Sequence, residues 1–394
     1  MRPILVLILL ATPMFVSAAG QLQPGLLAQQ ADRWWSDAVQ SRLVLAGQNK
    51  SELVHALSRT AKDQRAAIAF VIENMPQRDL QSLTADFLVT EVQKACEIQD
   101  KATWKIPEDL FLNYVLPYAN VDEPREPWRA SLNAICQPLV KDCKTPGEAA
   151  QRLNEKLFGE IQVKYSTQRK RANQAPSESI EQGLASCTGL SILLVDACRS
   201  VGVPARLAGI PSWPNKQGNH TWVEVWDDGW QFTGAAEPNP QGLNRTWFQG
   251  DAALADPNSK LHSIYAASFQ KTDTAFPMVW SPEKRVFAEN VTMRYIPKTN
   301  APLSNAVNVM VRVWNRDKSK REIAKVEVFD PKSTDVLESG TTKAGTADMN
   351  DMLSFQLAPD KTYRLRISQA KTTFTHELTT NQNGNQLIEL KMPK

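Results

Sequence analysis

One stretch of the chain, residues 186–237, constrains the fold more than any other part of the 394-residue sequence. Cys187 stands just ahead of a dense apolar run from Leu190 to Val201, and Gly202 follows as a helix stop. The pattern predicts a buried helix with a thiol at its N-terminal end. Unpaired backbone N–H groups and the positive end of the helix dipole lie there, and both favour the thiolate over the thiol.

A histidine follows this predicted helix. His220 opens the run H-T-W-V-E-V-W, which is typical of a strand. A histidine close to a helix-capping cysteine is the minimum needed for a cysteine nucleophile and its base. Each residue also has a purely structural interpretation, because lone cysteines are often small buried hydrophobic residues and lone histidines are often hydrogen-bonded core residues. The sequence therefore offers Cys187 as a candidate nucleophile and His220 as its candidate base.

The order of these elements is more specific than either residue alone. A cysteine at a helix start, then G-V-P-A-R, then N-H-T-W-V-E-V-W resembles the transglutaminase-like superfamily of papain-fold thiol enzymes. The resemblance implies a papain/transglutaminase-like α+β core, in which Cys187 attacks an acyl carbonyl and His220 activates it. It also implies an aspartate near the end of the next strand that orients the histidine. In this chain, that position holds Gly234.

Hairpin pairing offers a replacement carboxylate. A two-residue turn at Asp228-Gly229 places Glu237 opposite His220. A three-residue loop that begins at Asp227 shifts the register by one residue and turns Glu237 away. We therefore take Glu237 as the candidate orienting carboxylate, with the three-residue loop as the open alternative.

Two tryptophans near the predicted site are candidate substrate-binding residues. Trp213 lies in the P-S-W-P loop before His220, where its ring would form a wall beside the acyl group. Trp222 follows on the strand that His220 opens. Packing in the core is the structural alternative for both rings.

The regions on either side of this core have different patterns. Apolar residues at spacings of three and four predict helices over residues 27–45, 52–71, 80–95, 108–116 and 127–140. The run Thr145-Pro146-Gly147-Glu148 predicts a capped helix that opens the core. Beyond Asn290, alternating strands are expected over residues 307–313, 324–329, 353–357, 363–367, 374–378 and 387–390.

These patterns predict an α+β protein in several parts. The expected division is a signal peptide at 1–19, a helical N-terminal domain at 20–144, a transglutaminase-like core at 145–285 and a C-terminal antiparallel β-sandwich at 290–394. The sandwich contains no cysteine and only one histidine, His376, so no catalytic residue is expected there.

The first residues indicate export. Arg2, the apolar run 4–10 and the small residues at 16–19 are typical of a secretory signal peptide. We therefore expect a periplasmic or extracellular protein without stable membrane insertion. In an oxidising compartment, one disulfide from Cys96 to Cys136 or Cys143 is expected, with Cys187 free and Cys198 a packed thiol.

Composition excludes several other functions. A formal net charge of +3 is too small to indicate a nucleic-acid partner. Phosphate loops and histidine–carboxylate metal clusters are absent from the sequence, so neither a cofactor nor a metal is expected. The expected partner is a protein or peptide substrate, or a cell-envelope polymer.

The resemblance implies chemistry on peptide or amide bonds through a thioester acyl-enzyme. Water or an amine can then accept the acyl group, and we favour hydrolysis because water is in large excess unless a site holds the amine. The alternative is a non-catalytic envelope binding or scaffold protein with a degenerate core, which the glycine at position 234 supports.

Overall fold

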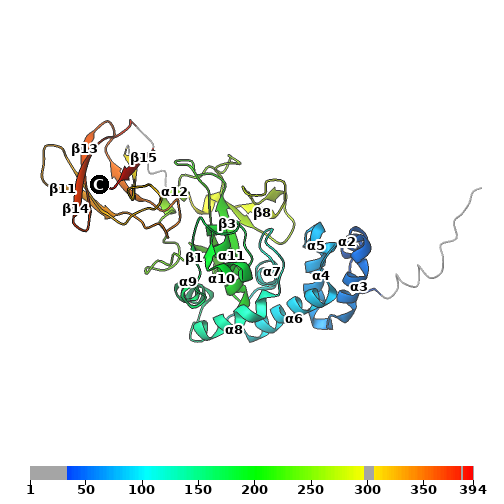
Figure 1. Ribbon diagram of the computed structural model, residues 1–394. Helices are drawn as coiled ribbons and strands as arrows, with labels where there is room; N and C mark the ends of the chain where they lie inside the picture. Colours follow the sequence, from blue (N-terminus) through cyan, green and yellow to red (C-terminus); the bar gives the residue numbers. More distant parts are fainter. Residues whose placement is uncertain (1–32, 297–305, 383–384, 394) are drawn as a thin grey trace, which may run out of the picture.

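The computed structural model describes residues 33–296, 306–382 and 385–393. The predicted signal peptide lies outside the described residues. Figure 1 shows three regions in a row: a helical region, a mixed core built around α11, and an all-strand region at the C-terminal end. The predicted α+β fold class is therefore confirmed. Every helix among the described residues is too short or too polar to span a bilayer.

The helical region forms its own hydrophobic core from residues such as Leu53, Leu57 and Ile68. The helix expected over 52–71 is in fact two helices, because the chain turns to an extended conformation at Thr60. The helices of this region are α2 (Asp37–Leu45), α3 (Lys50–Arg59), α4 (Arg65–Asn74), α5 (Gln77–Leu80), α6 (Ala85–Lys101) and α7 (Glu108–Tyr114). The next helix, α8 (Trp128–Val140), packs against α11 of the central region.

The expected disulfide is wrong, because all five cysteines are free thiols. Cys96 packs at the edge of the N-terminal core, whereas Cys136, Cys143 and Cys198 belong to the core around α11. The proposed partners therefore lie in separate hydrophobic cores.

The central region packs helices against a six-stranded sheet in the order β5-β4-β3-β6-β8-β7. Its strands are β3 (Ala205–Ile210), β4 (His220–Trp226), β5 (Trp230–Thr233), β6 (Tyr265–Ala267), β7 (Thr274–Ala275) and β8 (Phe287–Asn290), and each neighbouring pair is antiparallel. The helices are α9 (Pro146–Glu160), α10 (Pro176–Gln182), α11 (Cys187–Ser200) and α12 (Gln249–Ala252), and a short parallel pair joins β1 (Lys164–Tyr165) to β2 (Leu184–Ala185).

Local sequence signals set the ends of α9 and α11. The Thr145 hydroxyl accepts a hydrogen bond from the Glu148 backbone N–H, as expected of an N-cap. Glu148 in turn accepts from the Lys144 N–H rather than from the capping residue. Gly202, just after α11, has φ +81°, a left-handed conformation that favours glycine.

The C-terminal region is a sandwich of two sheets, with strand orders β11-β10-β13-β14 and β12-β9-β15. All six expected strands are present. The additional strand β11 was missed because it is mostly exposed and lacks apolar alternation. All pairs are antiparallel except β9 and β15, which run parallel. The strands are β9 (Val307–Trp314), β10 (Lys325–Phe329), β11 (Val336–Thr341), β12 (Leu353–Leu357), β13 (Thr362–Gln369), β14 (Thr372–Thr379) and β15 (Asn385–Lys391).

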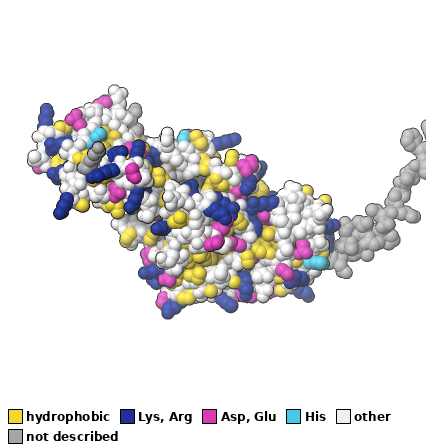
Figure 2. All heavy atoms as spheres, viewed as in Figure 1, with side chains coloured by type: hydrophobic (Ala, Val, Ile, Leu, Met, Phe, Trp, Pro, Cys, Tyr) yellow, Lys and Arg dark blue, Asp and Glu magenta, His cyan; other side chains and the backbone are white. Residues whose placement is uncertain are grey.

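The face of the molecule in Figure 2 carries side chains of both charges. On the face shown in Figure 2, basic and acidic side chains are interspersed along the molecule. This mixture is consistent with the small net charge of the chain.

Candidate active site

The fold brings Cys187 and His220 together. Cys187 is the first residue of α11, and His220 is the first residue of β4, which packs against that helix. The Cys187 sulfur, a ring nitrogen of His220 and a carboxylate oxygen of Asp348 all lie within 4.8 Å of one another. Two of these three residues were predicted from the sequence, and the third was not.

The environment of Cys187 favours the neutral thiol. Burial, followed by the negative charge of Asp348, raises the pKa of the thiol, and the charge of Glu237 adds to this effect. Backbone hydrogen bonds from Thr221 and Thr188 act in the opposite direction. The pKa of the thiol is therefore raised, not lowered as the position at a helix N-terminus led us to expect from the sequence.

His220 is enclosed by aromatic rings. Its side chain is only 2% exposed, and its ring centroid lies 4.9 Å from those of both Trp247 and Phe248. Neither ring nitrogen has a hydrogen-bond partner. Burial lowers the pKa of His220, and the nearby Asp348 partly offsets this effect. The imidazole is therefore held neutral, which is the state that accepts a proton.

The burial of Trp213 and Trp222 does not fit the predicted substrate-binding surface. The two rings stack on each other with their centroids 6.2 Å apart, and both are almost fully buried. Their rings also lie against His220, and the Trp222 indole donates to the Tyr295 hydroxyl at 2.8 Å. Both tryptophans therefore pack in the core around His220, which is the structural alternative to substrate binding.

The third member of the group, Asp348, comes from the β-sandwich. Its Oδ2 atom lies 3.7 Å from Nδ1 of His220, and both side chains are 2% exposed. Asp348 lies in residues 342–352, the connection between β11 and β12, which we call the sandwich loop. The expectation that the sandwich supplies no residue to the site is therefore wrong.

Hydrogen bonds hold the sandwich loop from both sides. On the sandwich side, the buried Arg321 guanidinium donates to backbone carbonyls of the loop at distances of 2.8–3.0 Å, including that of Asp348. On the core side, Asn350 donates to the carbonyl of Asn219 at 2.6 Å, next to His220. The Met349 N–H donates to the Tyr165 hydroxyl at 3.3 Å. The position of Asp348 is thus fixed by both regions.

The hairpin argument for Glu237 is wrong. The observed register pairs Val225 with Gln231 and Trp226 with Trp230, which corresponds to the three-residue loop rather than the two-residue turn. Glu237 instead accepts a hydrogen bond from the Trp247 indole at 2.8 Å. Burial and the charge of Asp348 raise its pKa. Asp348, not Glu237, lies within ion-pair distance of the His220 ring.

A cleft of about 710 Å³ opens beside this group, between the core and the sandwich. Asp348 and Glu237 line it together with Tyr165 and Trp247. Its rim carries the basic residues Lys164, Arg245 and Lys343. Of the three grouped residues, only Asp348 lines this cleft, so the cleft meets the group on the side of the sandwich loop.

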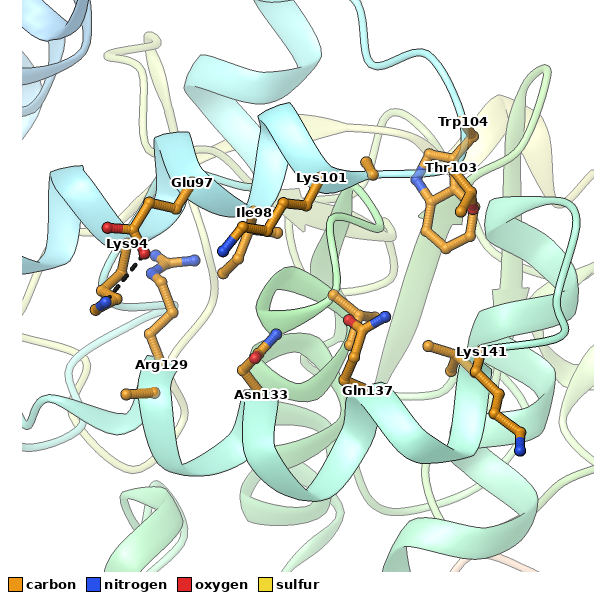
Figure 3. A pocket seen from close by; sticks show the side chains of 14 residues that line it. Lys94, Glu97, Ile98, Lys101, Thr103, Trp104, Arg129, Asn133, Gln137 and Lys141 are labelled. Carbon is orange, nitrogen blue, oxygen red and sulfur yellow. Dashed lines mark hydrogen bonds and ion pairs between the residues drawn. The ribbon is translucent and has the colours of Figure 1, made fainter.

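A separate pocket of about 490 Å³ lies between α6 and α8. In Figure 3, Lys94, Lys101 and Lys141 extend around it, while Asn133 and Gln137 line its middle. Lys94 is paired with Glu97 at 3.0 Å. None of the three residues grouped around the Cys187 sulfur lines this pocket, so it is distinct from the candidate active site.

Comparison with known proteins supports the class of this site. Residues 133–235 match the family model of the transglutaminase-like superfamily, a range that includes Cys187 and His220 but not Asp348. The chain thus contains a transglutaminase-like domain.

Two solved structures are similar to the chain. A candidate cysteine protease from Cytophaga hutchinsonii is 17% identical, with 43% of this chain and 60% of that chain covered and a TM-score of 0.27. Red sea bream transglutaminase is 9% identical, with 73% of this chain and 65% of that chain covered and a TM-score of 0.35. The match thus spans less than two thirds of either structure. Comparison with curated proteins found no match.

Proposed function

We propose that this chain is an exported cysteine enzyme that acts on peptide or amide bonds through a thioester, with water as the usual acceptor. The observation that supports this most directly is the grouping of Cys187, His220 and Asp348 within 4.8 Å, with Asp348 lining a cleft. The substrate is a protein, a peptide or a peptide-bearing cell-envelope polymer.

In the first step, His220 takes the thiol proton as the Cys187 sulfur attacks the acyl carbonyl. The neutral resting pair suits this route, because the imidazole can accept the proton and the thiolate forms only as the bond is made. The backbone N–H of Cys187, at the start of α11, is the candidate donor to the developing oxyanion. His220 next gives that proton to the leaving amine as the C–N bond breaks, which leaves the acyl group as a thioester on Cys187. The neutral His220 then takes a proton from a water molecule as its oxygen attacks the thioester, and the proton returns to the Cys187 sulfur as the acid leaves.

Asp348 acts as a positioning residue. Its distance of 3.7 Å from Nδ1 is too long for a hydrogen bond but short enough for an ion pair once the imidazole is protonated. Because both side chains are buried, the attraction is weakly screened and grows as His220 takes the proton. Asp348 thereby favours the charged state that follows proton transfer.

The proposal is tested by incubating the reduced protein with peptides that carry a glutamine or backbone amide, in water enriched in ¹⁸O and with an added primary amine. Hydrolysis incorporates ¹⁸O into the acid product, whereas transamidation yields the amine adduct. We expect the labelled acid, and no product from Cys187→Ser. Predominant amine adduct would overturn the preference for hydrolysis, and equal turnover by Cys187→Ser would overturn the mechanism.

Export is tested separately, by expressing the full chain and following its processing. We expect removal of the first nineteen or so residues and recovery of the protein outside the cytoplasm. Retention of the intact N-terminus in the cytoplasm would contradict this part of the proposal.

A further inference from the structure

Two of the three side chains at the site, His220 and Asp348, have ligand atoms without a hydrogen-bond partner. Both ring nitrogens of His220 and the Oδ2 atom of Asp348 are buried without a hydrogen-bond partner. Buried polar atoms are normally satisfied, and each one left unpaired costs free energy. The Cys187 sulfur lies within 4.8 Å of both groups. The unpaired atoms therefore mark a place where a ligand would be stabilised.

The chemistry of these atoms selects the ligand. One sulfur, one imidazole nitrogen and one carboxylate oxygen form the kind of mixed donor set that binds Zn²⁺. Ligand atoms around a tetrahedral zinc ion lie roughly 3.3–3.8 Å apart, as follows from metal–ligand distances of about 2.0–2.3 Å. For one nitrogen and one oxygen ligand the separation is about 3.3–3.5 Å, and the His220–Asp348 distance of 3.7 Å is only slightly longer. A modest side-chain adjustment would bring the sulfur to the same centre.

Two further carboxyl groups lie near the three grouped residues. Glu237 and Asp351 line the same cleft as Asp348, and Oδ1 of Asp351 is likewise buried and unpaired. Three basic side chains also lie nearby. The Arg321 guanidinium donates to backbone carbonyls of the sandwich loop, including that of Asp348 at 3.0 Å. Lys343 lies 3.7 Å from the other Asp351 oxygen, and Lys216 is paired with Asp251 at 2.5 Å. The cleft beside Asp348 gives a hydrated ion a path to the site.

We propose that Cys187, His220 and Asp348 form a reversible, inhibitory Zn²⁺ site. On binding, a zinc–sulfur bond replaces the S–H bond of Cys187, and the thiol proton passes to solvent. The His220 nitrogen and the Asp348 carboxylate supply two further ligands, and water takes the fourth position, as in open zinc sites. Binding itself does not depend on the proposed function. Its inhibitory consequence does, because the ion occupies the sulfur and nitrogen that acyl transfer requires.

The direct test uses Co²⁺ and Zn²⁺ on the reduced full chain. Co²⁺ should give a thiolate-to-metal charge-transfer band with a stoichiometry of one ion per chain, and Zn²⁺ should displace it. Cys187→Ser should abolish the band. Asp348→Asn should weaken Zn²⁺ binding by at least about 100-fold, since even indirect partners of metal ligands contribute about 10- to 100-fold. The matched controls are Asp335→Asn, at an exposed carboxylate of the same sandwich, and Cys143→Ser, and both should leave affinity unchanged.

A second measurement requires no variant. Zn²⁺ should protect Cys187 from iodoacetamide, as located by peptide mapping, and a chelator should restore labelling. Absence of one-to-one binding, persistence of the band in Cys187→Ser, or unchanged affinity in Asp348→Asn would overturn the site. If the band appears but no acyl-enzyme ever forms, the metal site stands and the proposed function fails. If the acyl-enzyme forms but no band appears, the reverse holds.

Discussion

Oδ2 of Asp348, in the C-terminal sandwich, lies 3.7 Å from Nδ1 of His220, in the transglutaminase-like core. The loop that carries Asp348 is held by Arg321 from one side and by Asn219 and Tyr165 from the other. The site is therefore assembled from two regions that are far apart in sequence. Whatever shifts the sandwich relative to the core will alter the environment of the histidine.

Replacement of Asp348 by Asn should lower kcat/KM by about 10²- to 10⁴-fold, the range typical of assistance to proton transfer. The charge of Asp348 raises the pKa of His220, so its removal should also move the acidic limb of the rate profile to lower pH. The measurement is a pH profile of kcat/KM for both proteins. Asp351→Asn, a change in the same loop, is the control. A drop in rate without any shift of the profile would indicate that Asp348 has only a structural role.

Replacement of Arg321 by Met should loosen the sandwich loop. Arg321 is 3% exposed and donates to four backbone carbonyls at 2.8–3.0 Å, which the variant would leave unpaired. We expect kcat/KM to fall by about 100-fold, since a displacement of about 1 Å can have this effect. Alkylation of Cys187 should become faster at the same time. Arg316→Met, at an exposed arginine near the same sheet, should do neither.

The pH dependence of activity should reflect a neutral histidine. Burial lowers the pKa of His220 from its usual 6.5, so the imidazole stays able to accept a proton at pH values below 6.5. The acidic limb of kcat/KM should therefore have its midpoint below pH 6.5, with activity lost only as the pH falls further. A midpoint above pH 6.5 would contradict the proposed environment.

A buried ion pair links the core sheet to the helical region. Arg206 on β3 donates to Glu224 on β4 at 2.8 Å and to the Tyr114 hydroxyl of α7 at 2.9 Å. Glu224→Gln should reduce the free energy of unfolding by up to about 3–5 kcal/mol, because the buried Arg206 guanidinium then keeps only the half-exposed Glu289, at 3.0 Å, as a counter-charge. Chemical denaturation measures the change. Glu389→Gln, at a more exposed pair, should cost less than about 1 kcal/mol, and equal effects would contradict the argument.

Much of the site could be predicted because its signals are local. Cys187 at the start of an apolar run, the glycine stop at 202 and the alternating strand from His220 each depend on residues close in sequence. The sandwich strands with buried alternation, such as Val307–Trp314, were found for the same reason. The exposed strand Val336–Thr341 carries no such alternation and was missed.

The rest depends on long-range packing. No periodicity connects Asp348 to His220, because the sandwich loop reaches the site only through tertiary contacts. The prediction of Glu237 depended on the register of the hairpin formed by β4 and β5. A two-residue turn would place Glu237 opposite His220, but the structure has the three-residue loop, which shifts the register by one residue. Trp213 and Trp222 were assigned to a surface because sequence does not reveal that their rings pack around the histidine.

The central claim is that the Cys187 sulfur, activated by His220, forms an acyl-enzyme. It is tested most directly by reacting the protein with p-nitrophenyl acetate, quenching in acid and locating the acetyl group by mass spectrometry. We predict a hydroxylamine-sensitive acetyl group on Cys187 in the wild-type protein, and its loss in His220→Ala. An acetyl group found only at other residues, or labelling of Cys187 that is no faster than that of the His220→Ala variant, would contradict the account.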